Sequence, residues 1–183
     1  MLRLFVGVGL PTSIAEKVGD RVDQLRSSFP NSRWVPPANY HITLKFIGEW
    51  KPERLAELVD KLKSVRSDPF SLSLNGWGGF PNLAAPNVMY IGVKDPQDHL
   101  VPLARQVDQL CQVVGIGDEG RDFHPHVTIA RKAQPLQNLS QHLSTNQNFE
   151  TPEFKVTSFA LFRSDPSPQG QVYSPVEHFE LRR

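Results

Sequence analysis

The sequence feature that most constrains the fold is an internal repeat, in which the second half of the chain matches the first at an offset of 85 residues. Four pieces match in this one register without a gap: 5–8 with 90–93, 11 with 96, 22–25 with 107–110, and 41–44 with 126–129. Coincidence between similar strands explains one short match, but four in register indicate a duplicated unit. We therefore expect a single domain, residues 1–183, in which units at about 1–85 and 86–183 face each other across a pseudo-two-fold axis.

Local patterns predict that each unit reads strand, helix, loop, strand. Short apolar, β-prone runs predict strands, and apolar residues at helical spacing after a capping residue or a proline predict helices. The expected strands are 2–9, 41–48, 70–75, 88–93, 126–131, 154–162 and 172–181, and the expected helices are 12–29, 52–65 and 98–114. The last two strands are expected to form an antiparallel pair. These elements predict an α+β or mixed α/β fold, and they do not determine the order of the strands.

Charge and composition exclude several classes of function. The 20 Lys and Arg residues nearly balance the 19 Asp and Glu residues, so the chain lacks the broad positive field of a protein that binds duplex nucleic acid. Any contact with nucleic acid is therefore expected to be local. The apolar start at 2–10 is too short for a membrane span and has no small-residue cleavage site, so we expect a cytoplasmic protein. Cys111 is the only cysteine, which excludes an intrachain disulfide, and we expect it to be buried in a helix.

Each half of the chain contains a His-x-Thr strand, formed by His41 with Thr43 and by His126 with Thr128. Successive side chains of a strand point to opposite faces, so each histidine shares a face with its threonine, about 6.6 Å away. The other face is apolar and is expected to pack on a helix. In a core each polar group would need a buried hydrogen-bond partner, so this polar face suits a cleft better. If the pseudo-two-fold axis brings the strands together, two imidazoles and two hydroxyls converge.

These four groups suit the hydrolysis of a phosphodiester without a metal. In-line displacement needs a base to activate the attacking oxygen and an acid on the opposite side to protonate the leaving oxygen. An imidazole pKa of about 6.5 allows one neutral and one charged ring, which predicts a bell-shaped rate profile around neutral pH. Asp and Glu show no clustered ligand pattern, so we expect no metal and no cofactor. Because duplication also copies inert residues, structural histidines are the alternative interpretation.

At these residues the sequence resembles the 2H phosphoesterase superfamily, in particular the bacterial and archaeal RNA 2′,3′-cyclic phosphodiesterases formerly called 2′-5′ RNA ligases. The resemblance covers nearly the whole chain, through segments 4–8, 41–49, 79–81, 123–131, 161–164 and 170–173. It implies a bilobal α+β fold, with two pseudo-symmetric antiparallel-sheet lobes, outer helices and a central cleft. It also implies hydrolysis of a 2′,3′-cyclic phosphate to a 2′-phosphate. The expected partners are RNA 3′ ends or small cyclic nucleotides, and we expect a monomer.

The resemblance assigns a role to each motif residue. It implies that His41 is the base that activates water and that His126 is the acid that protonates the 3′ oxygen. It implies that Thr43 and Thr128 hold phosphate oxygens. It also implies that Arg131, which follows the second motif, clamps the phosphate.

Alternation along the strands bears on two further candidates for substrate binding. Arg131 lies five residues after His126, so it would turn away from the cleft unless the strand ends or bulges there. Lys45 lies four residues after His41, so it would lie on the cleft face, with a solvated strand-end lysine as the alternative. His124 forms His-Pro-His with His126 but has no further zinc ligands around it, so we expect it to be a supporting residue at the rim.

Other interpretations stay open at the level of the sequence. Trp34, Phe80 and Phe123 flank the motifs and are candidates to stack a nucleobase, although such aromatics more often belong to the core. One rival function is a nucleotide-binding module that turns over nothing. Another is an enzyme of the same architecture that acts on a different cyclic phosphate or on a 2′-5′-linked oligonucleotide. The sequence does not separate these substrates, because loops read the base and the chain length.

Overall fold

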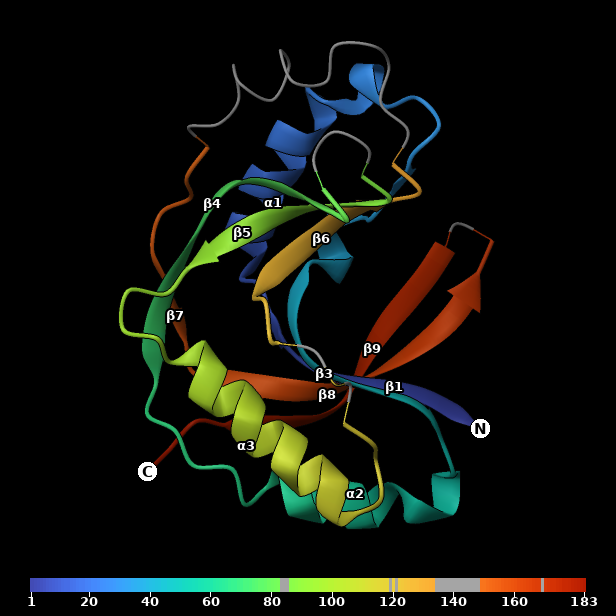
Figure 1. Ribbon diagram of the computed structural model, residues 1–183, viewed down its shortest axis with the longest axis vertical. Helices are drawn as coiled ribbons and strands as arrows, with labels where there is room; N and C mark the ends of the chain where they lie inside the picture. Colours follow the sequence, from blue (N-terminus) through green and yellow to red (C-terminus); the bar gives the residue numbers. More distant parts are fainter. Residues whose placement is uncertain (83–85, 119, 121, 134–148, 169) are drawn as a thin grey trace.

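The computed structural model describes residues 1–82, 86–118, 120, 122–133, 149–168 and 170–183. In these residues a strongly curled antiparallel sheet forms the centre of an α+β fold, as predicted (Figure 1). Its strands are β1 (Leu2–Gly9), β2 (Arg33–Trp34), β3 (His41–Trp50), β4 (Phe70–Phe80), β5 (Val88–Lys94), β6 (His126–Arg131), β7 (Phe154–Val156), β8 (Ser158–Ser167) and β9 (Gly170–Glu180). Along the sheet they follow the order β7-β4-β5-β6-β3-β1-β8-β9, and β2 pairs with β6 beside this path.

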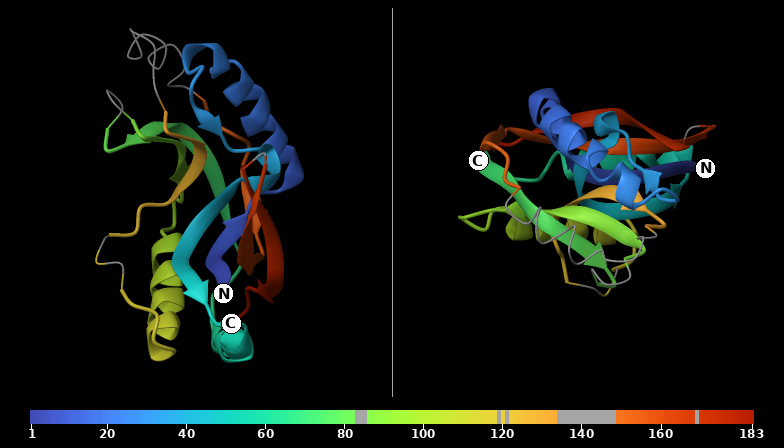
Figure 2. Two further views of the ribbon diagram at one scale, coloured as in Figure 1. Left: turned by 90° about the vertical axis from the view of Figure 1, so that its right-hand side faces the viewer. Right: turned by 90° about the horizontal axis from the view of Figure 1, so that it is seen from above.

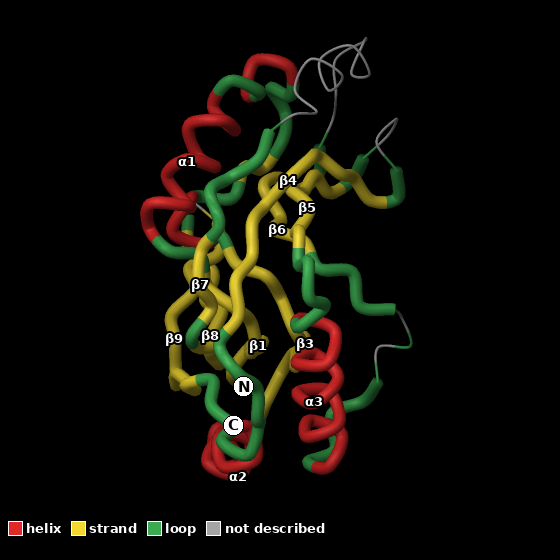
Figure 3. The backbone as a smooth tube through the Cα atoms, turned by 90° about the vertical axis from the view of Figure 1, so that its left-hand side faces the viewer, coloured by secondary structure: helices red, strands yellow, loops and turns green. Residues whose placement is uncertain are grey.

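In the part of the chain that the structure describes, three α-helices flank the sheet: α1 (Thr12–Asp23), α2 (Leu55–Leu62) and α3 (Leu100–Val113). Figures 1 and 3 place α1 at the end of the molecule that holds β4, β5 and β6, and α2 and α3 at the opposite end. Each helix buries one apolar side, and in α3 this side includes Cys111, which is buried as predicted. No helix of the described part of the chain combines the length and the apolar character that crossing a membrane requires.

The two halves of the sheet meet where β3 lies beside β6 (Figure 2). The pairing residues are Ile42 and Val127, which occupy equivalent positions of the sequence repeat and are both fully buried. One half then runs through β6, β5, β4 and β7, and the other through β3, β1, β8 and β9. The boundary between the predicted repeat units, after about residue 85, adjoins residues 83–85, which lie outside the described residues.

Bulges occur at equivalent positions of β3 and β6. In β3 the extra residue is Leu44, because the residues on either side of it pair with adjacent residues of β1. In β6 the extra residue is Ile129, for the same reason against β5. A bulge adds one residue to a strand, so side chains beyond it point to the face opposite to the one that alternation predicts. The faces of Lys45 and Arg131 are therefore the reverse of those predicted.

The structure also differs from the predicted elements in some of their bounds: β4 runs to Phe80 rather than to 75, and α1 ends at Asp23 rather than at 29. Two further differences concern the sheet. The run 154–162, predicted as one strand, contains β7 and β8 with a break at Thr157. Strand β7 pairs with β4, whereas β8 pairs with β1 and β9, so the break takes the chain from one half of the sheet to the other. The short strand β2, which the local pattern did not predict, pairs with the end of β6.

Candidate active site

His41, Thr43, His126 and Thr128 come together on one face of the sheet, where β3 lies beside β6. In each strand the histidine and the threonine flank the buried residue at which the two strands pair. Because that central residue points into the core, its neighbours point to the other face and are half-buried. In an antiparallel pair with this register, His41 lies across from Thr128 and Thr43 lies across from His126. The structure thus brings the two predicted motifs to one place.

Each imidazole is held by a hydrogen bond of the same kind, from its Nδ1 to the backbone carbonyl two residues earlier. Nδ1 of His41 donates to the backbone carbonyl of Asn39 at 2.7 Å, and Nδ1 of His126 donates to the carbonyl of His124 at 2.7 Å. A carbonyl only accepts, so Nδ1 carries a proton in each ring and Nε2 is the nitrogen left for chemistry. The Thr43 hydroxyl lies 3.1 Å from Nε2 of His41. Sequence reasoning missed Asn39, although it is equivalent to His124 in the repeat.

Aromatic rings enclose His41 on several sides. The ring centroid of Phe5 lies 4.6 Å from that of His41, Tyr173 meets it edge-on at 5.2 Å, and Phe162 lies at 6.2 Å. Phe162 in turn stacks on Phe5 at 5.0 Å. These rings come from β1, β8 and β9, so the final strands of the chain complete the surroundings of the first motif. Sequence reasoning assigned no role to any of the three.

His126 has a similar but more open aromatic surrounding. The rings of Phe80 and Tyr90 each lie 5.1 Å from the His126 ring, and they pack against each other at 4.6 Å. Tyr90 is equivalent to Phe5 in the repeat, which is the signal that would have found it. A Cβ atom at Gly78 would overlap the Tyr90 ring, so glycine allows this ring to lie across β4. The sequence suggested Trp34, Phe80 and Phe123 as stacking candidates. In the described part of the chain, only Phe80 has a ring contact with a motif histidine.

The electrostatics of the site favour neutral imidazoles. Burial lowers the pKa of His41 from 6.5 to about 4, against the opposing effect of its bond to Asn39, and the charges of Arg131 and His126 lower it further. Burial also lowers the pKa of His126 below 6.5, and the charges of His124 and Arg131 act in the same direction. Within the described residues no carboxylate pairs with either ring. In the free protein both rings therefore hold a proton less readily than an exposed histidine.

Arg131 lies on the same face as the motif residues, which overturns the expectation from strict alternation. The bulge at Ile129 is the cause, because it leaves Ala130 buried and turns Arg131 outward to the face of Thr128. Its positive charge lowers the pKa of both histidines. Arg131 therefore lies on the face of the motif residues, and its role as a phosphate clamp stays a prediction.

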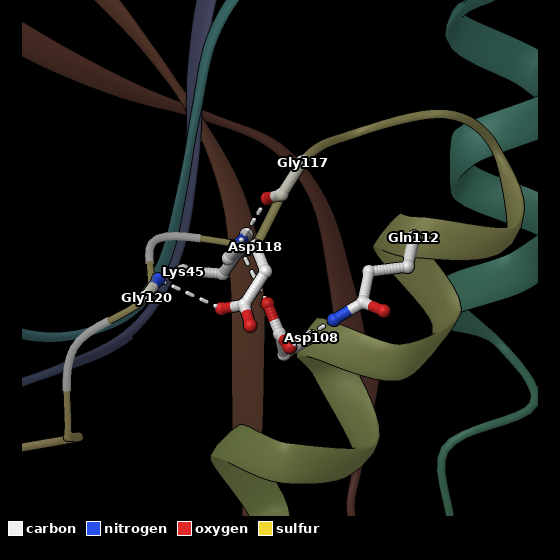
Figure 4. Close-up of polar contacts among 6 residues, drawn as sticks. All are labelled: Lys45, Asp108, Gln112, Gly117, Asp118 and Gly120. Atoms are coloured by element: carbon white, nitrogen blue, oxygen red, sulfur yellow. Dashed lines mark hydrogen bonds and ion pairs between the residues drawn. The ribbon is translucent and has the colours of Figure 1, made fainter.

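Lys45 does not lie on the face of the motif residues, so the predicted place of this side chain is wrong. The bulge at Leu44 turns it toward α3, where only 3% of the side chain is exposed (Figure 4). Its Nζ donates to the carbonyl of Gly117 at 2.8 Å and pairs with Asp108 at 2.5 Å. Gln112 donates to the other oxygen of that carboxylate at 2.6 Å. Lys45 therefore ties the first motif strand to α3.

Replacing Lys45 is expected to affect stability rather than substrate binding. Lys45→Ala removes a charged hydrogen bond and an ion pair, and it should lower the free energy of unfolding by about 2 kcal/mol. The cost stays moderate because the Asp108 side chain is 28% exposed and can be hydrated. Lys155→Ala, on the exposed side of β7, is the matched control and should unfold like the wild type. A raised KM with unchanged unfolding in denaturant would instead place Lys45 at the substrate.

A pocket of about 470 Å³ opens beside His41. It is bounded by the end of β1, the first turn of α1, residues 37–40, and the rings of Phe162 and Tyr173. Thr12, Glu16 and other polar residues share the wall with apolar ones. This volume and this mixed lining are typical of a site for a small organic ligand.

The structure gives His124 a supporting position. Its carbonyl holds His126, and its Nε2 lies 3.2 Å from the Tyr90 hydroxyl. The described residues contain no group of three or more His, Cys, Asp or Glu side chains placed to hold a metal ion. The contacts of His124 with His126 and Tyr90 agree with the expectation of a supporting residue at the rim.

Residues 11–168 match the 2′-5′ RNA ligase superfamily, and the chain belongs to it. More closely, the chain is 34% identical to the RNA 2′,3′-cyclic phosphodiesterase of Archaeoglobus fulgidus, over 98% of this chain and 100% of that protein. It is 32% identical to the RNA 2′,3′-cyclic phosphodiesterase of Aquifex aeolicus, over 99% and 98%. The resemblance seen in the sequence is confirmed.

Solved structures show the same fold. A crystal structure of a protein from Thermus thermophilus superposes with a TM-score of 0.82 at 29% identity, over 99% of this chain and 98% of that one. The crystal structure of E. coli LigT complexed with 3′-AMP superposes with a TM-score of 0.78 at 27% identity, over 100% and 99%. LigT has also been crystallised with ATP and with NADP⁺. Structural relatives of this chain therefore bind nucleotides.

Proposed function

We propose that this chain hydrolyses a 2′,3′-cyclic phosphate at an RNA end to a 2′-phosphate, using its two histidines and no metal. The observation that carries the proposal is the matched pair of imidazoles. Both Nδ1 atoms are fixed by a backbone carbonyl, so proton transfer falls to the two Nε2 atoms, and that of His41 lies 3.1 Å from the Thr43 hydroxyl. The curated relatives named RNA 2′,3′-cyclic phosphodiesterases support the choice of substrate.

In the proposed reaction His41 is the base and His126 is the acid. Nε2 of His41 takes a proton from water, and the water oxygen attacks phosphorus. The bond from phosphorus to the 3′ oxygen breaks, and Nε2 of His126 gives a proton to that oxygen, so the phosphate stays on the 2′ oxygen. Thr43 and Thr128 donate hydrogen bonds to the other phosphate oxygens, and Arg131 offsets their charge.

Enclosure supports this division of roles. A base must be neutral to accept a proton, and burial lowers the pKa of His41 to about 4. Three aromatic rings lie around this imidazole. An acid must carry a proton, and His126 lies in the more open surrounding, where a bound phosphate would stabilise the imidazolium. Because the pKa of His126 is also lowered in the free protein, its protonation in the proposed reaction depends on the negative charge of the bound phosphate, which raises this pKa.

The pocket beside His41 suits the nucleoside part of the terminal residue. It adjoins the proposed base and has Phe162 and Tyr173 in its wall, which are suited to stack a nucleobase. We further propose that the fold is bilobal and duplicated, with units at about 1–85 and 86–183, because the equivalent residues Ile42 and Val127 pair at its centre. Each unit contributes strands to both halves of the sheet, since β4 lies with β5 and β6, and β8 and β9 lie with β1 and β3. Both histidines come from one chain, so we propose that a monomer is active.

The test incubates the purified protein, with EDTA present, with a short RNA that ends in a 2′,3′-cyclic phosphate. We expect conversion to a 2′-phosphate end, identified by chromatography against 2′- and 3′-phosphate standards. Activity lost in EDTA and restored by a divalent ion would contradict the metal-free mechanism. A 3′-phosphate product would show that the 2′ oxygen, and not the 3′ oxygen, is the leaving group. Tight binding without turnover would favour the nucleotide-binding module.

A further inference from the structure

Two arginines lie opposite each other at the end of the second motif strand. Arg33 of β2 pairs with Arg131 of β6, and the next pair inward is Trp34 with Ala130. Residues directly opposite in an antiparallel pair point to the same face, so Arg33 lies on the face of Arg131 and of the motif residues. Arg33 and Arg131 are both exposed.

The charges of this pair are not neutralised within the described part of the chain. Neither arginine forms an ion pair there, whereas Arg26 pairs with Asp23 and Arg163 with Asp165, each at 2.6 Å. Like charges directly opposite on neighbouring strands repel each other, and an anion between them removes that cost. Two guanidinium groups side by side also match the several acceptor oxygens of a phosphate group.

Arg33 and Arg131 lie close to the place proposed for the reacting phosphate. Arg131 follows Thr128 by three residues, one of which is the bulged Ile129, so the two are about 7 Å apart along β6. The charge of Arg131 reaches both histidines. Arg33 stands on the neighbouring strand, beside the main path of the sheet. Positive charge therefore extends from the motif residues to the outside of the site.

We propose that Arg33 binds the phosphodiester that joins the terminal nucleotide to the one before it, so that the site recognises the end of an RNA chain rather than a free cyclic mononucleotide. This inference rests on the proposed function and adds a residue that determines substrate length. Arg131 then contacts the reacting phosphate, and Arg33 contacts the next phosphate along the chain. A cyclic mononucleotide has no group to place at Arg33.

The test measures binding of unreactive product analogues, so it does not depend on turnover. One ligand is an RNA tetranucleotide that ends in a 2′-phosphate, and the other is a nucleoside 2′-monophosphate. Arg33→Ala should weaken binding of the tetranucleotide about tenfold and that of the mononucleotide less than twofold. The slope of log affinity against log salt should fall by about 0.7 for the tetranucleotide, because one phosphate contact is lost.

Arg105→Ala is the matched control, since Arg105 is an exposed arginine on α3. Arg33→Lys keeps the charge and should bind the tetranucleotide more tightly than Arg33→Ala, and thermal unfolding checks that each variant is folded. Equal losses for both ligands, or no loss for either, would overturn the assignment of Arg33. Turnover of cyclic-phosphate RNA by the wild type is measured separately, so failure of the proposed function is distinguishable from failure of this inference.

Discussion

His41→Ala and His126→Ala are each expected to reduce kcat/KM for a cyclic-phosphate RNA end by about 100-fold or more. In the proposed mechanism each ring performs one of two proton transfers, and their fixed positions on neighbouring strands prevent either from doing both. The reduction should appear mainly in kcat, because the phosphate contacts of the threonines and Arg131 remain. Steady-state kinetics of the purified variants with the RNA substrate give both constants.

Loss of folding must be separated from loss of chemistry in these variants. The His41 ring packs against Phe5 and Tyr173, so alanine leaves a gap there, and His41→Asn provides a second variant with a larger polar side chain. His178→Ala is the control, because that histidine is exposed on β9. A variant at either motif histidine that unfolds like the wild type and keeps near-normal turnover would reject the two-histidine mechanism.

The sequence alone predicted the centre of the site because two local rules combine there. Alternation along a strand places each histidine with its threonine, and the repeat makes the two strands equivalent. The structure adds that the equivalent residues Ile42 and Val127 pair directly, which brings the four side chains together. No local pattern contains that pairing, since residues far apart in the chain form it.

The departures from strict alternation at Lys45 and at Arg131 have one physical cause. A bulge depends on the register between a strand and its partner, so the sequence of β3 or β6 alone does not reveal it. Leu44 and Ile129 are equivalent in the repeat, and both are buried. Regular alternation along the strand also predicts that they are buried, so their burial does not reveal the bulge. Once β1 and β5 are paired, the extra residue reverses the next side chains. The polar lysine then becomes the buried one, and the arginine reaches the site.

The aromatic surroundings were missed for a related reason. Phe162 and Tyr173 reach His41 because β8 and β9 continue the sheet beyond β1, and the order of strands could not be predicted from the sequence. The break at Thr157, which allows β8 to join β1, lies inside a continuous β-prone run. The break lies at Thr157 because β7 pairs with β4 in one half of the sheet and β8 pairs with β1 in the other. That arrangement is a property of the whole fold and not of the local sequence.

The pH dependence of the rate is expected to be bell-shaped, with its maximum in the mildly acidic range when kcat/KM is measured. This constant reports the ionisation of the free protein, in which burial lowers the pKa of both histidines. The prediction from the sequence placed the limbs around neutral pH, using the pKa of an exposed imidazole. Burial of the two rings in the structure moves both limbs to lower pH.

The sign follows from the proposed roles. His41 acts as a base when neutral, so kcat/KM should rise as the pH rises through about 4. His126 acts as an acid when protonated, so kcat/KM should fall as the pH rises through its pKa, which lies below 6.5. In the complex the negative phosphate favours both protonated rings, so the profile of kcat should lie at higher pH than that of kcat/KM.

The two variants identify which histidine gives which limb. His41→Ala should lose the acidic limb and keep the alkaline one, whereas His126→Ala should lose the alkaline limb and keep the acidic one. Because the rings affect each other's pKa, the limbs belong to the coupled pair, and the remaining limb should also shift upward when one positive neighbour is removed. Residual rates are measured from about pH 4 to 9 in buffers of constant ionic strength, a range set by the imidazole titrations. Exchanged limbs would reverse the assignment of base and acid, and a flat wild-type profile would reject acid–base catalysis by this pair.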